Sequence, residues 1–136
     1  MKSMTETFKN YCNKTGIKLQ KVDDDVYRIG FGGKHACLES FVTIDEEDGE
    51  IIMETILPVK VSPEKRATGA EIVVRLNSKF RNGFIDLSMN SGYLTYKTNF
   101  LLGKSELQND MVKHLIFSNW ISADGSFSVI NAVLFG

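Results

Sequence analysis

Alternating apolar and polar residues, in runs separated by short turns, constrain the fold of this sequence more than any other feature. Residues 26–32 alternate with the period of a half-buried strand. The next two runs, residues 38–44 and 51–59, flank an acidic turn at residues 45–49, and the second run is apolar on both faces, as a central strand is. Strands joined by short turns pair antiparallel, so we expect a sheet built from hairpins.

Helix signals precede and follow these strands. Residues 3–14 carry one apolar stripe at helical spacing, and Gly16 ends the segment. Residues 62–64 (Ser-Pro-Glu) combine a capping residue, a proline suited to the first helical position and an acid near the positive end of the helix dipole. This start predicts a helix that reaches Phe80.

A second hairpin and two further helices complete the expected order. Residues 84–89 and 93–100 alternate around a turn of Asn, Ser and Gly, which predicts a hairpin. A capping box predicts a helix over residues 105–121. The Asp-Gly-Ser sequence at residues 124–126 predicts a break, and a last short helix is expected over residues 127–134.

These elements define an α+β fold class, with the order α-βββ-α-ββ-α-α and an antiparallel sheet of about five strands packed against helices. A chain of 136 residues has the usual size of one domain, and its 43% apolar and 24% charged residues are close to globular averages. No repeat or linker divides the sequence. We therefore expect one domain over residues 1–136.

The near-equal numbers of acidic and basic side chains bear on which partners the protein can attract. Sixteen basic side chains nearly cancel 17 acidic ones, which favours neither nucleic acid nor an anionic membrane as a partner. The first ten residues lack the apolar stretch of a signal peptide, and the longest apolar runs are far below the roughly 20 residues of a membrane-spanning helix. Cys12 and Cys37 lack metal-binding or redox spacing, so we expect a cytoplasmic protein with two reduced thiols.

Three segments of the second half carry a family resemblance: residues 71–77 (EIVVRLN), 83–87 (GFIDL) and 92–97 (GYLTYK), followed by the predicted helix pair. The chain resembles the YbjN-like family, sometimes labelled bacterial sensory transduction regulators, whose fold is similar to that of class I type III secretion chaperones. The resemblance implies a compact α+β module that acts by contacting proteins. It implies no cofactor and offers no catalytic residues to carry over.

The spacing of residues does not match that of a phosphate-binding loop, a zinc site or a catalytic Cys-His pair. Residues 30–34 (Gly-Phe-Gly-Gly-Lys) lack the spacing of a P-loop, and a strand instead of a helix follows, so we interpret them as a strand end and hairpin turn. His35, Cys37 and His114, taken with Cys12, lack the paired spacing of a zinc site and the partners of a Cys-His nucleophile. We expect neither a metal nor a catalytic residue.

Charged clusters are interpreted as solvated surface. The acidic residues 23–25 and 45–50 lack the alternating ligand pattern of a calcium loop. Basic side chains cluster on the helix predicted over residues 62–80, but acidic residues interleave with them and stacking aromatics are missing. This pattern indicates a charged outer face and not an RNA site.

The C-terminal region is apolar around its predicted helices instead of along one stripe. Helices of this kind are either buried on several sides or lie at an interface, and the sequence leaves both open. A homodimer is expected here, because a short helix in a small domain hides only the face turned inward and twofold pairing is the commonest arrangement. The residues proposed for the contact are Trp120, Phe127, Val129, Ile130, Val133 and Phe135.

Two functional hypotheses follow from these observations. The first is a non-catalytic protein-interaction or chaperone-like module, because catalytic motifs are absent from the sequence and the C-terminal region is apolar. The alternative is a small-molecule-binding domain or an unrecognised enzyme, with a pocket between sheet and helices that uses Arg75 or His35 as its polar group.

Overall fold

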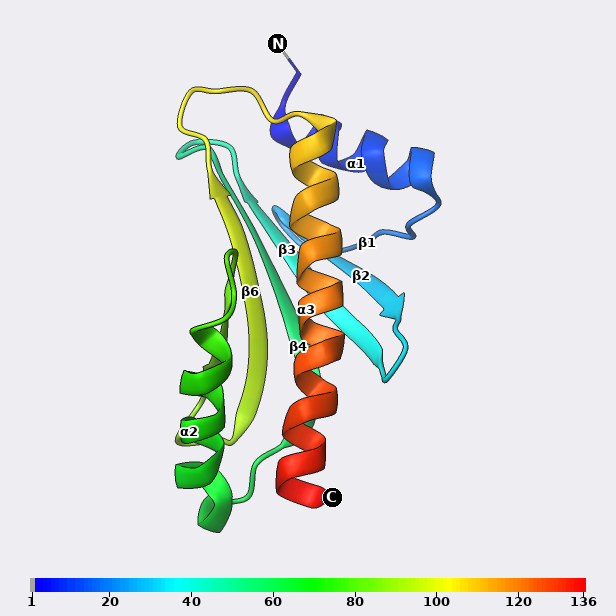
Figure 1. The fold of residues 1–136 in the computed structure, drawn as a ribbon. Coiled ribbons are helices and arrows are strands. Elements are labelled where there is room, and N and C mark those ends of the chain that lie inside the picture. The colour runs from blue at the N-terminus through cyan, green and yellow to red at the C-terminus, as the bar shows by residue number, and fades with distance from the viewer. Residues whose placement is uncertain (1) are drawn as a thin grey trace.

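Six strands form one antiparallel sheet in the computed structural model, which describes residues 2–136 (Figure 1). Their spatial order is β1-β2-β3-β4-β6-β5, so β4 lies at the centre as the apolar pattern of residues 51–59 predicts. The chain therefore has the expected α+β class, with one strand more than expected. The strands are β1 (Gln20–Asp23), β2 (Val26–Gly32), β3 (Cys37–Asp45), β4 (Glu50–Lys60), β5 (Phe84–Leu87) and β6 (Tyr93–Leu101).

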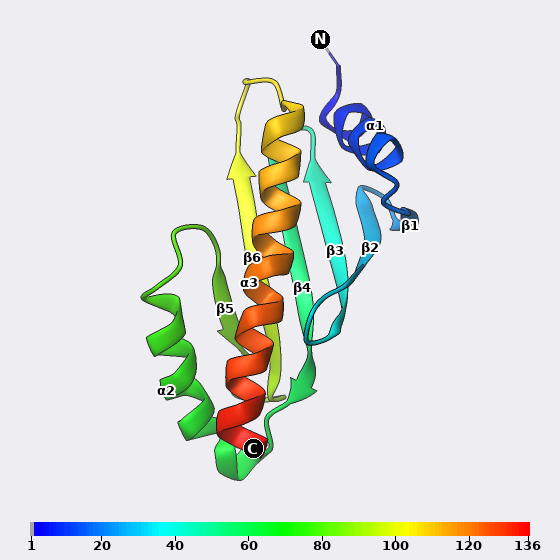
Figure 2. The same ribbon diagram turned by 45° about the vertical axis from the view of Figure 1, so that its right-hand side comes forward.

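Three α-helices pack on the same face of this sheet (Figures 1 and 2). Helix α1 (Met4–Thr15) covers the end of the sheet near β2, and a 3-10 turn (Pro63–Lys65) leads into α2 (Arg66–Asn77) beside β5. Helix α3 (Asn109–Phe135) runs along β4 and β6 between the other two helices. The opposite face of the sheet has no helix of residues 2–136 over it.

Two hydrophobic clusters lie side by side under α3. The first joins α1 to the N-terminal half of α3 and contains Phe8, Val42 and Met53. The second joins α2 to the C-terminal half of α3 and contains Val73 and Tyr96. Alternate residues of the strands point into these clusters, which is the pattern expected of a sheet with one packed face.

A group of buried, hydrogen-bonded polar side chains, here called the polar seam, joins the sheet to the middle of α3. Asn119 is fully buried, and its Nδ2 donates to the Met53 carbonyl (3.1 Å), the Tyr96 carbonyl (3.3 Å) and Thr98 Oγ1 (3.1 Å). Its Oδ1 accepts from Thr55 Oγ1. These bonds reach two neighbouring strands, so they fix where α3 sits on the sheet.

The C-terminal region is one helix of 27 residues, so the predicted break at residues 124–126 is wrong. Asp124 lies inside α3, where its carboxylate accepts the backbone N–H groups of Lys34 (3.2 Å), His35 (2.9 Å) and Ala36 (3.1 Å). Gly125 also lies inside α3, where it faces open space. Contacts with the β2–β3 loop therefore override the local preference of Asp and Gly for a turn.

Three smaller differences have local causes. Strand β1 was not expected, because its four residues are all exposed and show no apolar alternation. Helix α3 begins at Asn109 instead of at the predicted capping box, and its N-cap residue Gln108 makes no side-chain cap. Helix α2 ends at Asn77, where the side-chain amide exchanges two hydrogen bonds with the backbone of Ile85 (2.7 and 3.0 Å) and so ties the helix end to β5.

We predict that Asn119→Ala destabilises the protein by about 3 kcal/mol or more, because the substitution removes the acceptor of the buried Thr55 hydroxyl and the amide donor to two carbonyls. Urea melts of the variant and the parent measure this difference. Asn131→Ala is the matched control, since Asn131 is an exposed asparagine on the same helix. Equal losses in the two variants would contradict the role assigned to the seam.

A second prediction concerns the loop held by Asp124. In Asp124→Ala, the backbone N–H groups of residues 34–36 lose their acceptor, so their hydrogen exchange should accelerate by about tenfold or more relative to the parent. Asp110→Ala, an exposed acid in the first turn of the same helix, should leave these amides unchanged. Unchanged exchange in Asp124→Ala would mean that other contacts hold the loop.

Candidate functional site

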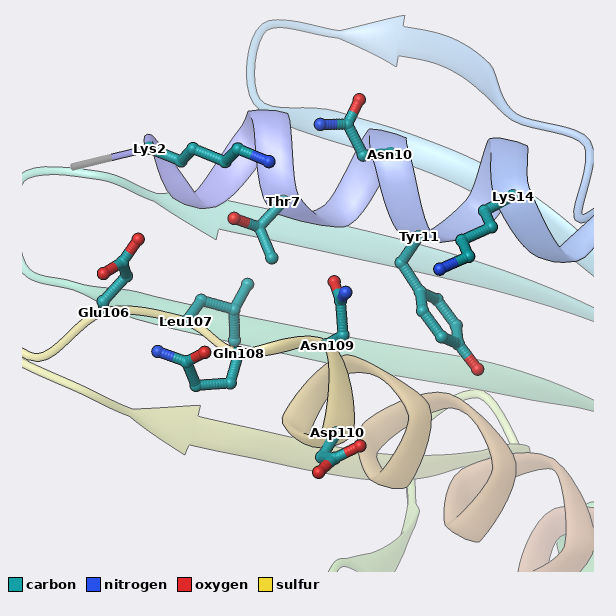
Figure 3. A pocket seen from close by; sticks show the side chains of 10 residues that line it. All are labelled: Lys2, Thr7, Asn10, Tyr11, Lys14, Glu106, Leu107, Gln108, Asn109 and Asp110. Carbon is teal, nitrogen blue, oxygen red and sulfur yellow. The ribbon is translucent and has the colours of Figure 1, made fainter.

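A pocket of about 720 Å³ opens between α1 and the segment that leads into α3 (Figure 3). Its walls come from parts of the chain that lie about 90 residues apart in sequence. The residues that line it are Lys2, Thr7, Asn10, Tyr11, Lys14, Glu106, Leu107, Gln108, Asn109 and Asp110. No sequence motif marks these positions, and the sequence analysis did not single them out.

Two largely buried residues of α1 present their hydroxyl groups to this pocket. Thr7 and Tyr11 are only 7% and 8% exposed, since both lie on the side of α1 that faces the core. Neither hydroxyl oxygen is among the buried side-chain atoms of residues 2–136 that lack a partner, so both are accessible from the pocket. Burial raises the pKa of Tyr11 above its usual value, and the neighbouring Cys12 and Asp110 raise it further. The phenol is therefore protonated at neutral pH and can donate a hydrogen bond.

The first turn of α3 adds free backbone donors to the pocket. Gln108, the N-cap residue, accepts from Met111 (3.0 Å) and Val112 (3.2 Å) through its carbonyl, but its side chain caps nothing. The N–H groups of Asn109 and Asp110 precede any residue that could serve as an intrahelical acceptor. Within the described part of the chain, they remain without one.

Charges of both signs surround the pocket. Lys2 and Lys14 lie on the α1 side, while Glu106 and Asp110 lie on the α3 side (Figure 3). None of these four forms an ion pair within 4.0 Å among the described residues. The two positive and two negative charges at the rim of the pocket therefore cancel in number, although they form no ion pairs with each other.

A second, more apolar groove of about 390 Å³ lies between α2 and the C-terminal half of α3. Val129 and Val133 form its α3 wall and are 44% and 58% exposed. From α2, apolar Ile72 and Leu76 contribute to its lining. The charged residues beside them are Glu71, Arg75 and Lys79, of which Arg75 pairs with Glu71 at 2.9 Å.

The six residues predicted for a protein interface divide between the core and the surface. Trp120 and Ile130 are 2% and 1% exposed, and the Trp120 ring stacks on Phe31 with centroids 4.8 Å apart. Phe127 is half-buried against the second hydrophobic cluster. The three exposed members are Val129, Val133 and Phe135. The apolar character of these residues in the sequence did not distinguish the buried ones from the exposed ones.

The sheet face without helices is a further apolar surface that the sequence analysis did not single out. Phe84, Tyr93 and Leu101 are each about half exposed or more, and the partly exposed Ile56 of β4 lies opposite Glu39 of β3 and Thr95 of β6. Two ion pairs cross this face, Arg28 with Glu39 at 3.3 Å and Lys97 with Asp86 at 3.6 Å. The face therefore mixes apolar side chains with ion-paired charges.

The residues considered for metal or nucleophile chemistry lie apart. His35 is in the β2–β3 loop, Cys37 begins β3, and His114 lies on α3 beside Phe100. No group of three metal-ligating side chains gathers anywhere in residues 2–136. Arg75 lies on the rim of the α2–α3 groove, so the two polar groups named for a sheet–helix pocket belong to different surfaces.

The two cysteines are unpaired, as expected, but their surroundings differ. Cys12 is fully buried, and burial raises the pKa of its thiol to about 12. Cys37 is exposed at the start of β3. Only Cys37 therefore presents an accessible thiol.

The fold and these surfaces define a class: an α+β domain with three helices on one face of an antiparallel sheet and with apolar and polar grooves along its longest helix. Solved structures share this architecture. YbjN, a proposed transcription regulator from E. coli, matches with a TM-score of 0.71 at 10% identity over 95% of this chain and 92% of that chain. The expected YbjN-like fold is thereby confirmed.

Two other solved structures match over nearly their whole length. An uncharacterised protein from Methanothermobacter thermautotrophicus gives a TM-score of 0.69 at 14% identity, covering 96% of this chain and 98% of that chain. A chain from the ExsC–ExsE complex gives 0.61 at 10% identity, covering 96% and 97%. No family model and no curated protein matches the sequence. At these identities the likeness establishes the fold.

Hydropathy adds one observation about membranes. In the part of the chain that the structure describes, no helix combines the length and the apolar character needed to cross a bilayer. Even α3, with 27 residues, does not qualify.

Thiol labelling tests the different surroundings of the two cysteines. We predict that iodoacetamide at pH 8 modifies Cys37 in the native protein while Cys12 stays unmodified, because the thiolate is the nucleophile and Cys12 is buried and protonated. Peptide mass spectrometry after quenching locates the label. Both sites should react after denaturation in guanidinium. Equally rapid native labelling at both sites would contradict the burial of Cys12.

Proposed function

We propose that this chain is a non-catalytic protein-interaction module, of a chaperone-like or regulatory kind, that pairs with a second copy through the α2–α3 groove. The observation that carries the proposal is the exposed apolar wall of that groove, with Val133 58% exposed on a helix that otherwise packs on the sheet. An apolar patch of this sort rimmed by charged residues is typical of an interaction site.

The charges on α2 favour a second copy as the occupant. Glu71 lies on α2 four residues before Arg75, and Lys79 lies four residues after it in the turn that follows the helix; all three line the groove. When two copies of α2 and the turn after it meet antiparallel about a twofold axis near Arg75, Glu71 of each copy faces Lys79 of the other. The surface is thus complementary to itself, as a twofold interface requires.

The comparisons support an interaction role in a limited way. One related fold was solved in a complex of two proteins, and another belongs to a proposed transcription regulator. Both statements concern those proteins, and they come to this chain as part of the proposal. A cytoplasmic site of action is also proposed, because both cysteines are free thiols.

We predict that the parent protein sediments as a dimer at micromolar concentration, and that Val133→Asp shifts it to the monomer by placing a carboxylate in the apolar contact. Sedimentation equilibrium gives the mass. Val74→Asp is the matched control, since Val74 is 70% exposed on α2 and does not line the groove. A parent that is monomeric throughout this range would remove the homodimer.

Charge exchange tests the pairing geometry independently. Glu71→Lys should weaken the dimer by placing lysines opposite each other, and adding Lys79→Glu to the same chain should restore it. If the double variant stays as weak as Glu71→Lys, the copies do not meet about the axis proposed here. A protein partner of another kind would then have to occupy the groove.

A further inference from the structure

Strand β5 forms one edge of the sheet, and its register on β6 shows which of its backbone groups face outward (Figure 2). In an antiparallel ladder, alternate residues direct their N–H and C=O groups to opposite sides of the strand. Ser88 donates its N–H to the Tyr93 carbonyl (2.9 Å), so the residues two and four positions before Ser88 also face β6. Ile85 and Leu87 therefore direct their backbone groups to the free edge.

The side chain of Asn77 occupies this edge at Ile85. Asn77 is the last residue of α2, and its Oδ1 accepts from the Ile85 N–H (2.7 Å) while its Nδ2 donates to the Ile85 carbonyl (3.0 Å). A carboxamide carries an acceptor and a donor side by side, as a peptide unit does. The two bonds are therefore the pair that a neighbouring strand would make with Ile85.

The opposite edge of the sheet has no comparable contact. Strand β1 is short and pairs with β2 only through residues 20–23, which leaves the second half of β2 without a neighbouring strand on that side. The bond from the Gly33 N–H to the Ala36 carbonyl (2.8 Å) and the register of β2 on β3 place the backbone groups of Gly30 and Gly32 outward. Among the residues that the structure describes, none bonds to these groups. The contact at Ile85 is thus not a general property of the edges of this sheet.

Strand β5 differs from the other edge strand in its apolar composition. Its sequence is Phe-Ile-Asp-Leu, in which Phe84 is 48% exposed and Ile85 is buried. The four residues of β1 are Gln-Lys-Val-Asp, and all of them are exposed. An apolar edge strand with free backbone groups is a template for pairing with another chain, whereas charged side chains discourage such pairing. An open edge would therefore have a greater consequence at β5 than at β1.

We propose that Asn77 acts as a substitute strand that prevents β5 from pairing with β5 of a second copy. Two copies that pair antiparallel about an axis at Ile85 would exchange the bonds that Asn77 now makes, and Phe84 of each copy would lie opposite Asp86 of the other. No like charges of β5 face each other in this arrangement, so the charges of the strand do not prevent the pairing. Asn77 does not line the α2–α3 groove, so the inference does not rest on the proposed function.

Amide hydrogen exchange, corrected for intrinsic rates, tests the contact in the folded protein. In the parent, the Ile85 amide should exchange at least about tenfold more slowly than the Gly30 amide, which faces the opposite edge without a partner among the described residues. In Asn77→Ala, the Ile85 amide should accelerate by about tenfold or more, while the Asp86 amide, which faces β6, should change less. Asn131→Ala, at an exposed asparagine of α3, is the matched control and should leave the Ile85 amide unchanged.

Self-association tests the blocking role. At equal concentration, Asn77→Ala should sediment with a larger mass than the parent, whatever the oligomeric state of the parent. Adding Phe84→Asp should return the mass to that of the parent, because the new carboxylate of each copy would face Asp86 of the other. Adding Phe84→Lys instead should leave the variant associated, because a lysine would then face Asp86. The two double variants lose the same aromatic ring, so their difference reports the pairing geometry alone.

Three results would overturn the inference. An Ile85 amide that exchanges in the parent as fast as the Gly30 amide would show that the contact does not protect the edge, and this measurement needs no variant. A folded Asn77→Ala that keeps the mass of the parent up to submillimolar concentration would show that the open edge does not pair. Equal association of the two double variants would place the contact elsewhere. Asn77→Asp, which keeps the size of the side chain but cannot donate to the Ile85 carbonyl, replaces Asn77→Ala if the latter does not fold.

Discussion

The buried hydrogen bonds around Asn119 are the constraint on which the arrangement of this molecule depends. They form a directed chain: Trp120 Nε1 donates to Ser40 Oγ (2.9 Å), and Ser40 Oγ lies 2.7 Å from Thr55 Oγ1, which donates to Asn119. Asn119 in turn donates to Thr98 Oγ1, whose hydroxyl donates to the Leu115 carbonyl (3.2 Å). The chain begins and ends on α3 and passes through β3, β4 and β6 between them. A shift of α3 along the sheet would leave several of these buried groups unpaired, so apolar packing alone does not decide its position.

This fixed position makes α3 the shared wall of both candidate sites. Its first turn closes the polar pocket against α1, and its C-terminal half forms the apolar groove with α2. Asn119 lies between these two ends, in contact with the centre of the sheet. The same helix therefore presents free backbone donors at one end and exposed valines at the other, while the sheet covers its buried side along the whole length.

The sequence was sufficient for elements whose local pattern agrees with their tertiary contacts. The run at residues 26–32, the second hairpin and the helix ended by Gly16 all have the expected type and place. The sequence pattern was insufficient where contacts between distant residues determine the local structure. The three loop amides that hold Asp124 are about 90 residues away, so the Asp-Gly-Ser sequence indicated a break that does not exist. The α1–α3 pocket was missed for the same reason, because its walls meet only after folding. Trp120 and Val133 are both apolar, and only the path of α3 over the sheet separates the buried residue from the exposed one.

The glycine-rich loop after β2 and the first turn of α3 both present free backbone N–H groups, but within residues 2–136 only the loop has a carboxylate that accepts from them. Gly33 approaches Asp124 so closely that a Cβ atom there would lie 2.3 Å from the carboxylate oxygen, and the next three residues donate their N–H groups to that carboxylate. The loop is therefore an anion cradle of the kind that its glycines suggest, but its occupant is a side chain of the same chain. The first turn of α3 offers comparable free N–H groups, and within residues 2–136 no carboxylate fills them. The difference is one of position, because the middle of α3 brings a carboxylate to the loop donors, whereas the donors of its first turn open into the pocket beside α1.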